Sequence, residues 1–422
     1  MEINQKIAFV GMTHLGINSA VACAEKGFYT TCFDTDDFTI SLLKAGKPIV
    51  SEPNLSELLK KNVEKLTFTS SPEFLSNCDL IYISADVPTD DFGNSDLSGI
   101  DGLISLIAKY ISNDAHCIIL SQVPPGFTRN KINVVPSIMY QVETLIFGNA
   151  IERALYPERF ILGLADTSKS IPKTLENYLN TFGCPILTMG YESAELAKIS
   201  INCCLVSSIS VANTLSEICE GIGADWSEIV PALKLDKRIG QFAYLKPGLG
   251  IAGGNLERDL NTVIRISKTI ESDYSVVASW LRNSHHRLEW VQKILISQGI
   301  SKKQKVKLCF WGLTYKENTN SLKNSPAIAN IKALSEHELV AYDPTIAERL
   351  DLFPNLLVMN DPIVSLDSSK ALIVMTPWPI FSAIDSKIII KHMKNKVVID
   401  PFAVLDGPKL ESAGVQYFTL GK

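Results

Sequence analysis

A glycine-containing turn near the start of the chain has residue types and spacing that suit a dinucleotide. The sequence GMTHLG occupies residues 11–16, directly after a short β-type run at 6–10 and before an alanine-rich helical pattern at 17–26. Asp34 follows a second β-type run at 29–33, near the usual offset of about 20 residues for a ribose-binding acid. The backbone N–H groups at such a helix N-terminus bind phosphate. The turn therefore predicts a dinucleotide site.

Thr13 departs from the strict fingerprint, which has glycine there so that the backbone can approach the pyrophosphate. We expect Thr13 to tune cofactor affinity more than to abolish binding. The Asp34 carboxylate would bind an unphosphorylated ribose and repel a 2′-phosphate, which favours NAD over NADP. The alternative is that Asp34 only begins a turn. The expected cofactor residues of this segment are Gly11, Thr13, His14, Leu15, Gly16 and Asp34.

The elements that position this turn alternate between strands and helices. Further β-type runs at 80–84 and 116–120 indicate a parallel, doubly wound sheet. From about 193 to 298 the β pattern fades, leaving two long helical patterns around a glycine-rich segment. Alternation then resumes with β-type runs at 307–311, 339–342, 371–375 and 396–399. We expect an α/β protein with two Rossmann-like domains, 1–192 and 301–422, joined by a helical central domain, 193–300, with a long helix.

Composition excludes several classes of protein. The net charge of -5 and the lack of a basic patch argue against nucleic-acid binding. Nine cysteines without a CxxC pair predict reduced cytoplasmic thiols, and neither a signal peptide nor a metal site is expected. The apolar stretch at 199–215 contains Asn202 and Asn213, so a buried soluble helix is favoured over a membrane span. His285 and His286 have no metal-ligand spacing and are expected on a helix surface.

Several ordered segments resemble the UDP-glucose and GDP-mannose dehydrogenase family, over essentially the whole chain. An ordered set of this kind is far more specific than one glycine motif. After the glycine turn, the segments are Asp34 with Gly46, Pro48, Glu52 and Pro53; VPT at 87–89; SQVPPG at 121–126; PER at 157–159; AELAKISIN at 194–202; KRIG at 237–240; PGLGIAGGNLERD at 247–259; GLTYKENT at 312–319; NSP at 324–326; and TPW at 376–378.

The resemblance implies an NAD-dependent oxidation of a nucleotide sugar, a UDP-sugar by preference. It assigns oxyanion stabilisation to Lys198 and Asn202, and the handling of protons and water to Asp259 and Glu158. A cationic amine beside an amide donor suits a developing alkoxide. From spacing alone, Lys198 would be a solvated helix residue, Asn202 a backbone-bonded amide and Glu158 a surface carboxylate. The resemblance also implies cofactor contacts by Val87, Pro88, Thr89 and Lys323, and substrate contacts by Arg238, Gly250, Gly253, Lys316 and Asn318. Without the resemblance, Lys316 and Asn318 would be interpreted as residues of an ordinary loop.

Three positions depart from the family pattern. Asn255 stands where the family has the cysteine whose thiolate adds to the intermediate aldehyde and makes a second oxidation possible. An amide is not nucleophilic, and Cys203 and Cys204 are the only conceivable spatial substitutes, with core packing the better interpretation. Gln122 replaces a threonine near the reacting centre, and Lys323 replaces an arginine.

The sequence therefore predicts an oxidoreductase limited to a reversible alcohol-to-carbonyl step, which releases a carbonyl product or reverses on the opposite face as an epimerase. Two alternatives stay open. One is a conventional 6-dehydrogenase that forms a uronic acid without cysteine, and the other is a non-catalytic nucleotide-sugar binder. The long central helix predicts a homodimer, and the resemblance implies a role in cell-surface polysaccharide synthesis. The sugar, the nucleotide and the oxidised carbon stay open.

Overall fold

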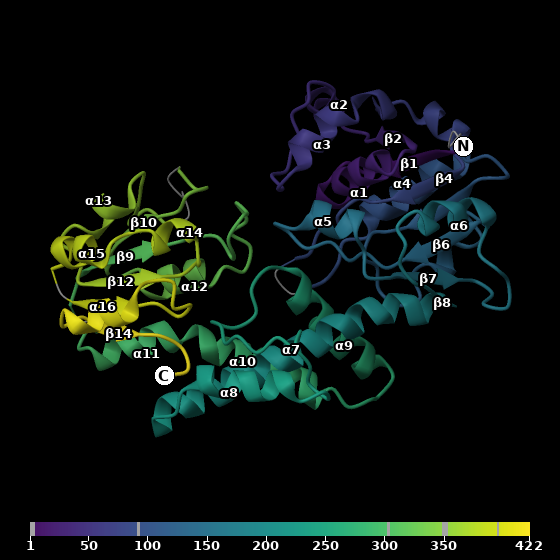
Figure 1. Ribbon diagram of the computed structural model, residues 1–422. Helices are drawn as coiled ribbons and strands as arrows, with labels where there is room; N and C mark the ends of the chain where they lie inside the picture. Colours follow the sequence, from purple (N-terminus) through teal and green to yellow (C-terminus); the bar gives the residue numbers. More distant parts are fainter. Residues whose placement is uncertain (1–4, 91–92, 302–303, 348–352, 395) are drawn as a thin grey trace. The chain divides into compact units, whose positions relative to one another are not determined.

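A computed structural model describes residues 5–90, 93–301, 304–347, 353–394 and 396–422. The chain divides into two compact units, Met1–Ile201 and Asn202–Lys422, whose boundary falls inside the helix α7 (Tyr191–Ile222). Each unit contains its own parallel sheet (Figure 1). The central helices and the second sheet belong to one compact unit, and the division into three domains stays a prediction.

The first unit is built on a sheet that has eight strands among the described residues, in the order β3-β2-β1-β4-β5-β6-β7-β8. All neighbouring strands are parallel except β6 and β7, which pair antiparallel. The crossover between β1 and β4 creates the switch point at which doubly wound sheets bind ligands. The strands are β1 (Lys6–Val10), β2 (Tyr29–Phe33), β3 (Leu66–Thr69), β4 (Leu80–Ile83), β5 (His116–Ile119), β6 (Ile138–Gln141), β7 (Phe160–Leu164) and β8 (Ile186–Gly190).

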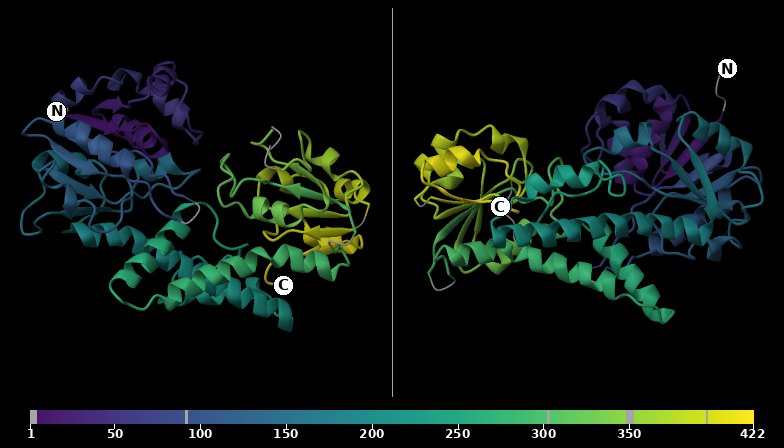
Figure 2. Two further views of the ribbon diagram at one scale, coloured as in Figure 1. Left: turned by 180° about the vertical axis from the view of Figure 1, so that it is seen from behind. Right: turned by 60° about the horizontal axis from the view of Figure 1, so that its bottom comes forward.

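Helices cover both faces of this sheet because alternate strand residues point to opposite sides. Ile7 and Phe9 of β1 pack into one apolar cluster, whereas Ala8 and Val10 pack into another. Figure 2 shows the resulting layers of the first unit. The first cluster includes residues of α1 (His14–Glu25), α2 (Asp37–Lys44), α3 (Leu55–Lys61), α5 (Ala150–Leu155) and α6 (Lys173–Asn180), and the second includes α4 (Ser98–Tyr110) and the first turn of α7.

The second sheet is parallel throughout its described strands, with the order β11-β10-β9-β12-β13-β14. This order is that of a classic dinucleotide-binding sheet. The strands are β9 (Lys307–Trp311), β10 (Glu338–Tyr342), β11 (Leu356–Met359), β12 (Ala371–Val374), β13 (Val397–Ile399) and β14 (Gln416–Phe418). One face packs on α11 (Trp290–Ser297) and α12 (Pro326–Ala333), and the other on α13 (Pro362–Leu366), α14 (Pro379–Ser382), α15 (Ser386–His392) and α16 (Gly407–Ser412). The α/β fold class with a helical central region is thus confirmed.

The helical centre has more segments than the two patterns predicted from sequence. After α7 come α8 (Trp226–Leu235), α9 (Asn255–Thr269), α10 (Ser275–Leu288) and α11. Asp225 explains the break before α8, since its carboxylate accepts a hydrogen bond from the Ser227 N–H and caps the new helix. Val206, Leu260 and Val277 form the small apolar core between α7, α9 and α10.

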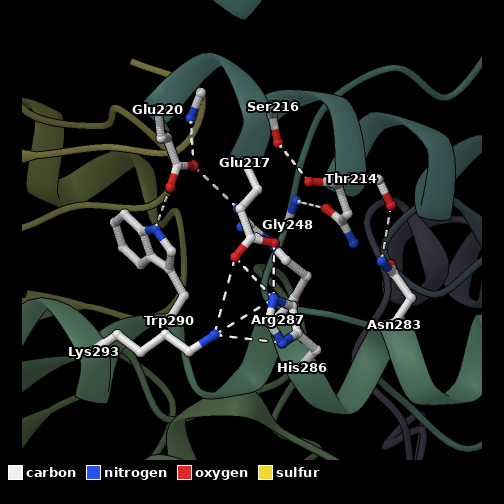
Figure 3. A network of polar contacts seen from close by, with 12 residues as sticks. Thr214, Ser216, Glu217, Glu220, Gly248, Asn283, His286, Arg287, Trp290 and Lys293 are labelled. Atoms are coloured by element: carbon white, nitrogen blue, oxygen red, sulfur yellow. Dashed lines mark hydrogen bonds and ion pairs between the residues drawn. The ribbon is translucent and has the colours of Figure 1, made fainter. Parts of the chain in front are cut away.

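A buried ionic network ties α7 to α10, α11 and the end of the chain (Figure 3). The Arg287 side chain is fully buried and lies 3.2 Å from Glu217 and 3.2 Å from Glu220. Glu220 also accepts hydrogen bonds from the Trp290 indole N–H at 2.8 Å and the Gly421 N–H at 2.9 Å. These contacts hold the last residues of the chain against the central helix.

The helix α7 is long and apolar enough to cross a membrane by length and composition, but only part of it is buried. It carries buried polar groups that have partners in the fold, including Glu195 and Asn202. Such groups are typical of a core helix and expensive in lipid. Part of the helix is buried, as the sequence predicted, and one face stays exposed.

Candidate active site and cofactor-binding site

The turn after β1 requires glycine at its first and last positions. Gly11 has a φ of +94°, and a Cβ added there would lie 2.6 Å from the Cβ of Ala85, which follows β4. A Cβ on Gly16 would lie 1.9 Å from the carbonyl oxygen of Gly11. The two glycines therefore let the turn close tightly at the switch point between β1 and β4.

Asp34 occupies the position expected of a ribose-binding acid. It follows β2, and its carboxylate accepts hydrogen bonds from the Met12 N–H at 2.6 Å and the Asp36 N–H at 3.0 Å. These two bonds fix the side chain beside the glycine turn. They also show that Asp34 does more than begin a turn.

A hollow of about 240 Å³ opens beside Asp34, and four predicted cofactor residues line it, Gly11, Thr13, Asp34 and Pro88. The glycine cradle, the carboxylate and the helix N-terminus fit the adenosine side of a dinucleotide. Sequence reasoning missed the other lining residues, which come from the segment after β2, the loop after β4 and α4. These are Thr35, Ala85, Asp86, Asp96, Gly99, Ile100 and Leu103.

The His14 side chain turns away from this hollow and into the fold. Its Nε2 lies 2.8 Å from Glu52 Oε1, and its ring stacks on Phe147 with centroids 3.8 Å apart. Burial raises the pKa of Glu52, but hydrogen bonds from His14 and from the N–H groups of Gly148 and Ala150 outweigh burial and lower the pKa. The His14 imidazole is therefore engaged within the fold, and a cofactor contact by His14 stays a prediction.

The remaining predicted cofactor residues lie in different places. Leu15 belongs to the apolar core, so only its backbone faces the turn. Val87 and Thr89 lie in the loop after β4, where Thr89 forms a bridge with Ser95. Lys323 belongs to the second unit, where its Cε lies 3.0 Å from a Cβ built on Gly254.

Lys198 is held by a carboxylate that the sequence gave no reason to single out. Its Nζ lies 3.1 Å from Glu143 Oε2 and donates a hydrogen bond to the Glu143 carbonyl oxygen at 3.0 Å. Both side chains are largely buried. Glu143 follows β6, 55 residues before Lys198. The pair keeps the ammonium in one position, which contrasts with a solvated helix residue.

Glu195, one turn earlier on α7, is a positioning residue for the loop that contains Gln122. Its carboxylate accepts hydrogen bonds from the Gly126 N–H at 2.6 Å and the Thr128 N–H at 2.8 Å. Burial raises the pKa of this carboxyl group, and the two N–H donors oppose that effect. The loop after β5 is thereby fixed to the helix that carries Lys198.

Asn202 and Asp259 are brought together in the second unit. The Asn202 side-chain amide donates a hydrogen bond to Asp259 Oδ2 at 2.5 Å, and Arg258 Nε lies 3.2 Å from Asp259 Oδ1. All three side chains are buried. Asn202 is therefore bonded to a carboxylate and not to backbone, and Asp259 has a cation beside it.

Asn255 is the first residue of α9 and is exposed at the helix N-terminus. The preceding glycines pack against the loop after β9: a Cβ on Gly253, where φ is +78°, would lie 3.3 Å from the Tyr315 ring. The Asn324 side chain donates to the Gly253 carbonyl oxygen at 2.9 Å. Gly250 is equally constrained, since a Cβ there would lie 2.5 Å from the carbonyl oxygen of Ser284.

The other predicted substrate residues lie on loops of the second unit. Lys316 Nζ lies 5.7 Å from the centroid of the Tyr315 ring. Asn318 is exposed and has a φ of +59°. The Arg238 side chain is almost fully exposed and pairs with Asp236 at 2.6 Å.

Glu158 lies on the surface of the first unit, with 62% of its side chain exposed. It pairs with Arg159 at 2.8 Å and Arg153 at 3.5 Å. This is the environment expected of a surface carboxylate. Its role in handling protons or water stays a prediction.

The thiols near this region do not resemble an activated nucleophile. Cys203 packs in the core between α7, α9 and α10. Burial, together with the charge of Asp259, raises the pKa of Cys203 to about 11. A nucleophilic cysteine needs the thiolate, which a pKa in this range suppresses at neutral pH. All nine cysteines, each in the described part of the chain, are free, and Cys204 is exposed.

Three family models match the chain in succession. They are those of the UDP-glucose/GDP-mannose dehydrogenase family: the NAD binding domain at residues 5–182, the central domain at 192–284 and the UDP binding domain at 309–407. The matched segments together contain the glycine turn, Lys198, Asn202, Asp259 and the loop after β9.

Relatives of known activity match over nearly their full length. The chain is 31% identical to the UDP-glucose 6-dehydrogenase of Rickettsia bellii (strain RML369-C), covering 98% of this chain and 99% of that protein. It is 28% identical to the UDP-glucose 6-dehydrogenase TuaD of Bacillus subtilis (strain 168), covering 99% and 93%. The fold is similar to that of a UDP-glucose dehydrogenase from Pyrobaculum islandicum, with a TM-score of 0.85, 24% identity, and coverage of 96% and 95%.

Proposed function

Since the chain belongs to the UDP-glucose/GDP-mannose dehydrogenase family of NAD-dependent enzymes, we propose that it oxidises a hydroxyl of a UDP-sugar and stops at the carbonyl. The observation that carries this proposal is Asn255 at the start of α9, the position where the resemblance to the family implies a cysteine. Cys203, the buried thiol of the adjacent pair on α7, is a poor replacement because its raised pKa keeps it protonated at neutral pH, and Cys204 is exposed on the surface.

The proposed step moves one hydride and one proton. When bound, NAD accepts the hydride from the sugar carbon, so NADH and a carbonyl group form from NAD and the alcohol. Asp259 accepts the hydroxyl proton, and the Asn202 amide and the Arg258 guanidinium keep the carboxylate in place. Lys198 stabilises the developing alkoxide with its ammonium group, which Glu143 orients.

The product distribution tests this proposal. The purified protein is incubated with NAD and a panel of UDP-sugars, with NADH followed by absorbance and the sugars by mass spectrometry and NMR. One NADH per carbonyl product is expected. Two NADH per uronic acid would overturn the single oxidation, an isomer without NADH would show epimerisation, and no change with any sugar would indicate a binding protein.

Substitution at position 255 tests the role of the missing thiol. Asn255→Cys places a thiol at a helix N-terminus, where backbone N–H groups stabilise thiolate. We expect this variant to form some acid and the matched control Asn255→Ser to form none.

Lys198→Ala should lower turnover at least about a hundredfold, as expected when a group that stabilises the oxyanion is lost, while UDP-sugar binding persists.

We also propose a homodimer formed through α7. Four apolar side chains recur at spacings of four, three and four residues along its exposed face, with exposures from 40% to 72%: Val211, Leu215, Ile218 and Ile222. A continuous stripe of this kind is typical of a helix interface. Leu215→Glu combined with Ile218→Glu should give a monomer in light scattering, whereas Ile270→Glu, outside the stripe, should not. A monomeric unmodified protein would contradict this proposal.

We also propose a cytoplasmic location. The proposed reaction needs NAD and a UDP-sugar, which are available there, and the free cysteines persist in a reducing compartment. Fractionation of cells that express the protein tests this, because recovery with the membrane would contradict it.

A further inference from the structure

The hollow beside the glycine turn is acidic. Three carboxylates line it, those of Asp34, Asp86 and Asp96, and none of its described lining residues is lysine or arginine. Asp34 is the expected ribose-binding acid, and Asp96 accepts hydrogen bonds from the Ser98 N–H and hydroxyl at the start of α4. Asp86 has no such role, although it faces a site that must accept a diphosphate with two negative charges.

Asp86 is fixed at the N-terminus of α1. Its backbone N–H donates to the Thr13 hydroxyl oxygen at 2.9 Å, and that hydroxyl donates to the Ser84 carbonyl oxygen at 3.2 Å. Ala85, the preceding residue, is in close contact with Gly11. Asp86 lines the hollow together with Gly11 and Thr13. Burial raises the pKa of its carboxyl group, and His14 and the Thr13 hydroxyl beside it oppose that effect.

The helix α1 supplies no anionic side chain at its own N-terminus, so its first N–H groups are available to an anion from elsewhere. The side chain of its N-cap, Thr13, does not bond to the first turn of α1, and the described first turn contains no acidic residue. The N–H groups and dipole at a helix N-terminus favour a negative charge. In a turn of this kind, the cofactor diphosphate takes that place.

We propose that Asp86 sets the affinity for NAD by competing with the cofactor diphosphate for the N-terminus of α1. The carboxylate and the diphosphate carry like charges and require the same N–H groups. NAD therefore binds more weakly than it would beside a neutral side chain. This inference rests on the cofactor of the family and not on the proposed single oxidation, so binding measurements test it separately from the reaction.

Removal of the charge without a change in shape is the direct test. Asp86→Asn should tighten the dissociation constant of NAD by about tenfold, which corresponds to about 1.4 kcal/mol. ADP-ribose, which keeps the diphosphate and lacks nicotinamide, should tighten equally. Adenosine, which lacks phosphate, should change less than about twofold. Calorimetric titration measures the first two ligands and NMR titration the third, with thermal unfolding as a check on folding.

Two further variants make the outcome decisive. Asp86→Gly removes the side chain and should tighten NAD binding in the same direction. Asp96→Asn is the matched control, because this carboxylate lines the same hollow but is already bonded to Ser98, and it should change the NAD affinity less than about twofold. Unchanged or weaker NAD binding by both Asp86 variants would overturn the proposal. An equal gain for adenosine, or for Asp96→Asn, would also overturn it.

Discussion

Replacement of Glu220 by alanine should destabilise the second unit strongly, because Glu220 is a counter-ion of a fully buried arginine. Glu220→Ala removes one of the two carboxylates paired with Arg287 and leaves Glu217 as the other. It also removes the acceptor of the Trp290 indole and of the Gly421 N–H, which holds the end of the chain. The loss in the free energy of unfolding should therefore exceed the loss that follows removal of a surface ion pair.

The magnitude follows from the burial of the partners. Removal of one member of a buried ion pair lowers the free energy of unfolding by about 3–5 kcal/mol. Because the Glu220 side chain is still 18% exposed, we expect a loss at the lower end, about 3 kcal/mol. For a unit of this size, each kcal/mol lowers the midpoint of thermal unfolding by about 2–4 °C. We expect a decrease of about 6–12 °C in calorimetry.

A matched control separates this effect from the loss of any glutamate. Glu336 is an exposed glutamate of the same unit, and Glu336→Ala should change the midpoint by less than about 2 °C. Arg287→Met in the Glu220→Ala background should recover part of the loss, since the buried cation that has lost one of its two counter-ions is then absent. A shift below about 2 °C for Glu220→Ala would refute the reasoning.

Two other perturbations follow from the site. Gly11→Ala places a Cβ 2.6 Å from that of Ala85 at a φ of +94°, so NAD binding in calorimetric titration should weaken at least about tenfold; unchanged affinity would show that the turn adapts. Since the pKa of Cys203 is raised to about 11, its thiolate is scarce at neutral pH and forms only as the pH rises toward that value. Its alkylation by iodoacetamide, read by tandem mass spectrometry with exposed Cys204 as reference, should be slow at pH 7.5 and accelerate above about pH 10; rapid reaction at neutral pH would contradict this.

The strands that flank a sharp turn could be predicted from the sequence to the residue. The β-type runs at 6–10 and 29–33 coincide with β1 and β2, because each is a short run of residues that favour strands and is followed at once by Gly11 or Asp34. The strands β3, β6, β7, β8, β11 and β14 were not predicted. Of these, β6 and β7 are buried along their whole length, whereas others lack a buried apolar run. In β8, for example, Leu187 is exposed and the strand lies at the sheet edge, so no buried apolar run marks it.

The same distinction between local and distant partners applies to the site. The glycine turn and Asp34 are recognisable because their spacing is fixed by one strand–turn–helix unit. Glu143 and Lys198 meet across 55 residues, and Glu52 meets the buried His14 across 38, so no local pattern announces either pair. Asp86 was missed for the same reason: its importance comes from the position of its loop beside α1, not from a motif.

Asp86 also bears on the product of the proposed single oxidation. An epimerase that returns the hydride to the opposite face of the sugar must keep one cofactor molecule through both half-reactions. An enzyme that releases a carbonyl product must instead exchange NADH for NAD after every turnover. The proposed competition by Asp86 at the N-terminus of α1 would weaken the binding of both redox forms, because both contain the same diphosphate. Weak retention favours exchange, and therefore the release of a carbonyl product.

This reasoning predicts that the protein, once purified by gel filtration without added cofactor, contains little NAD or NADH. Asp86→Asn should retain measurably more, as determined by extraction and chromatography of the bound nucleotide, and Asp96→Asn should not. Near-stoichiometric cofactor in the unmodified protein would refute the argument, since a cofactor held that tightly could serve repeated hydride transfer and return. The neutral variant would then be expected to change neither retention nor the balance between carbonyl product and isomer.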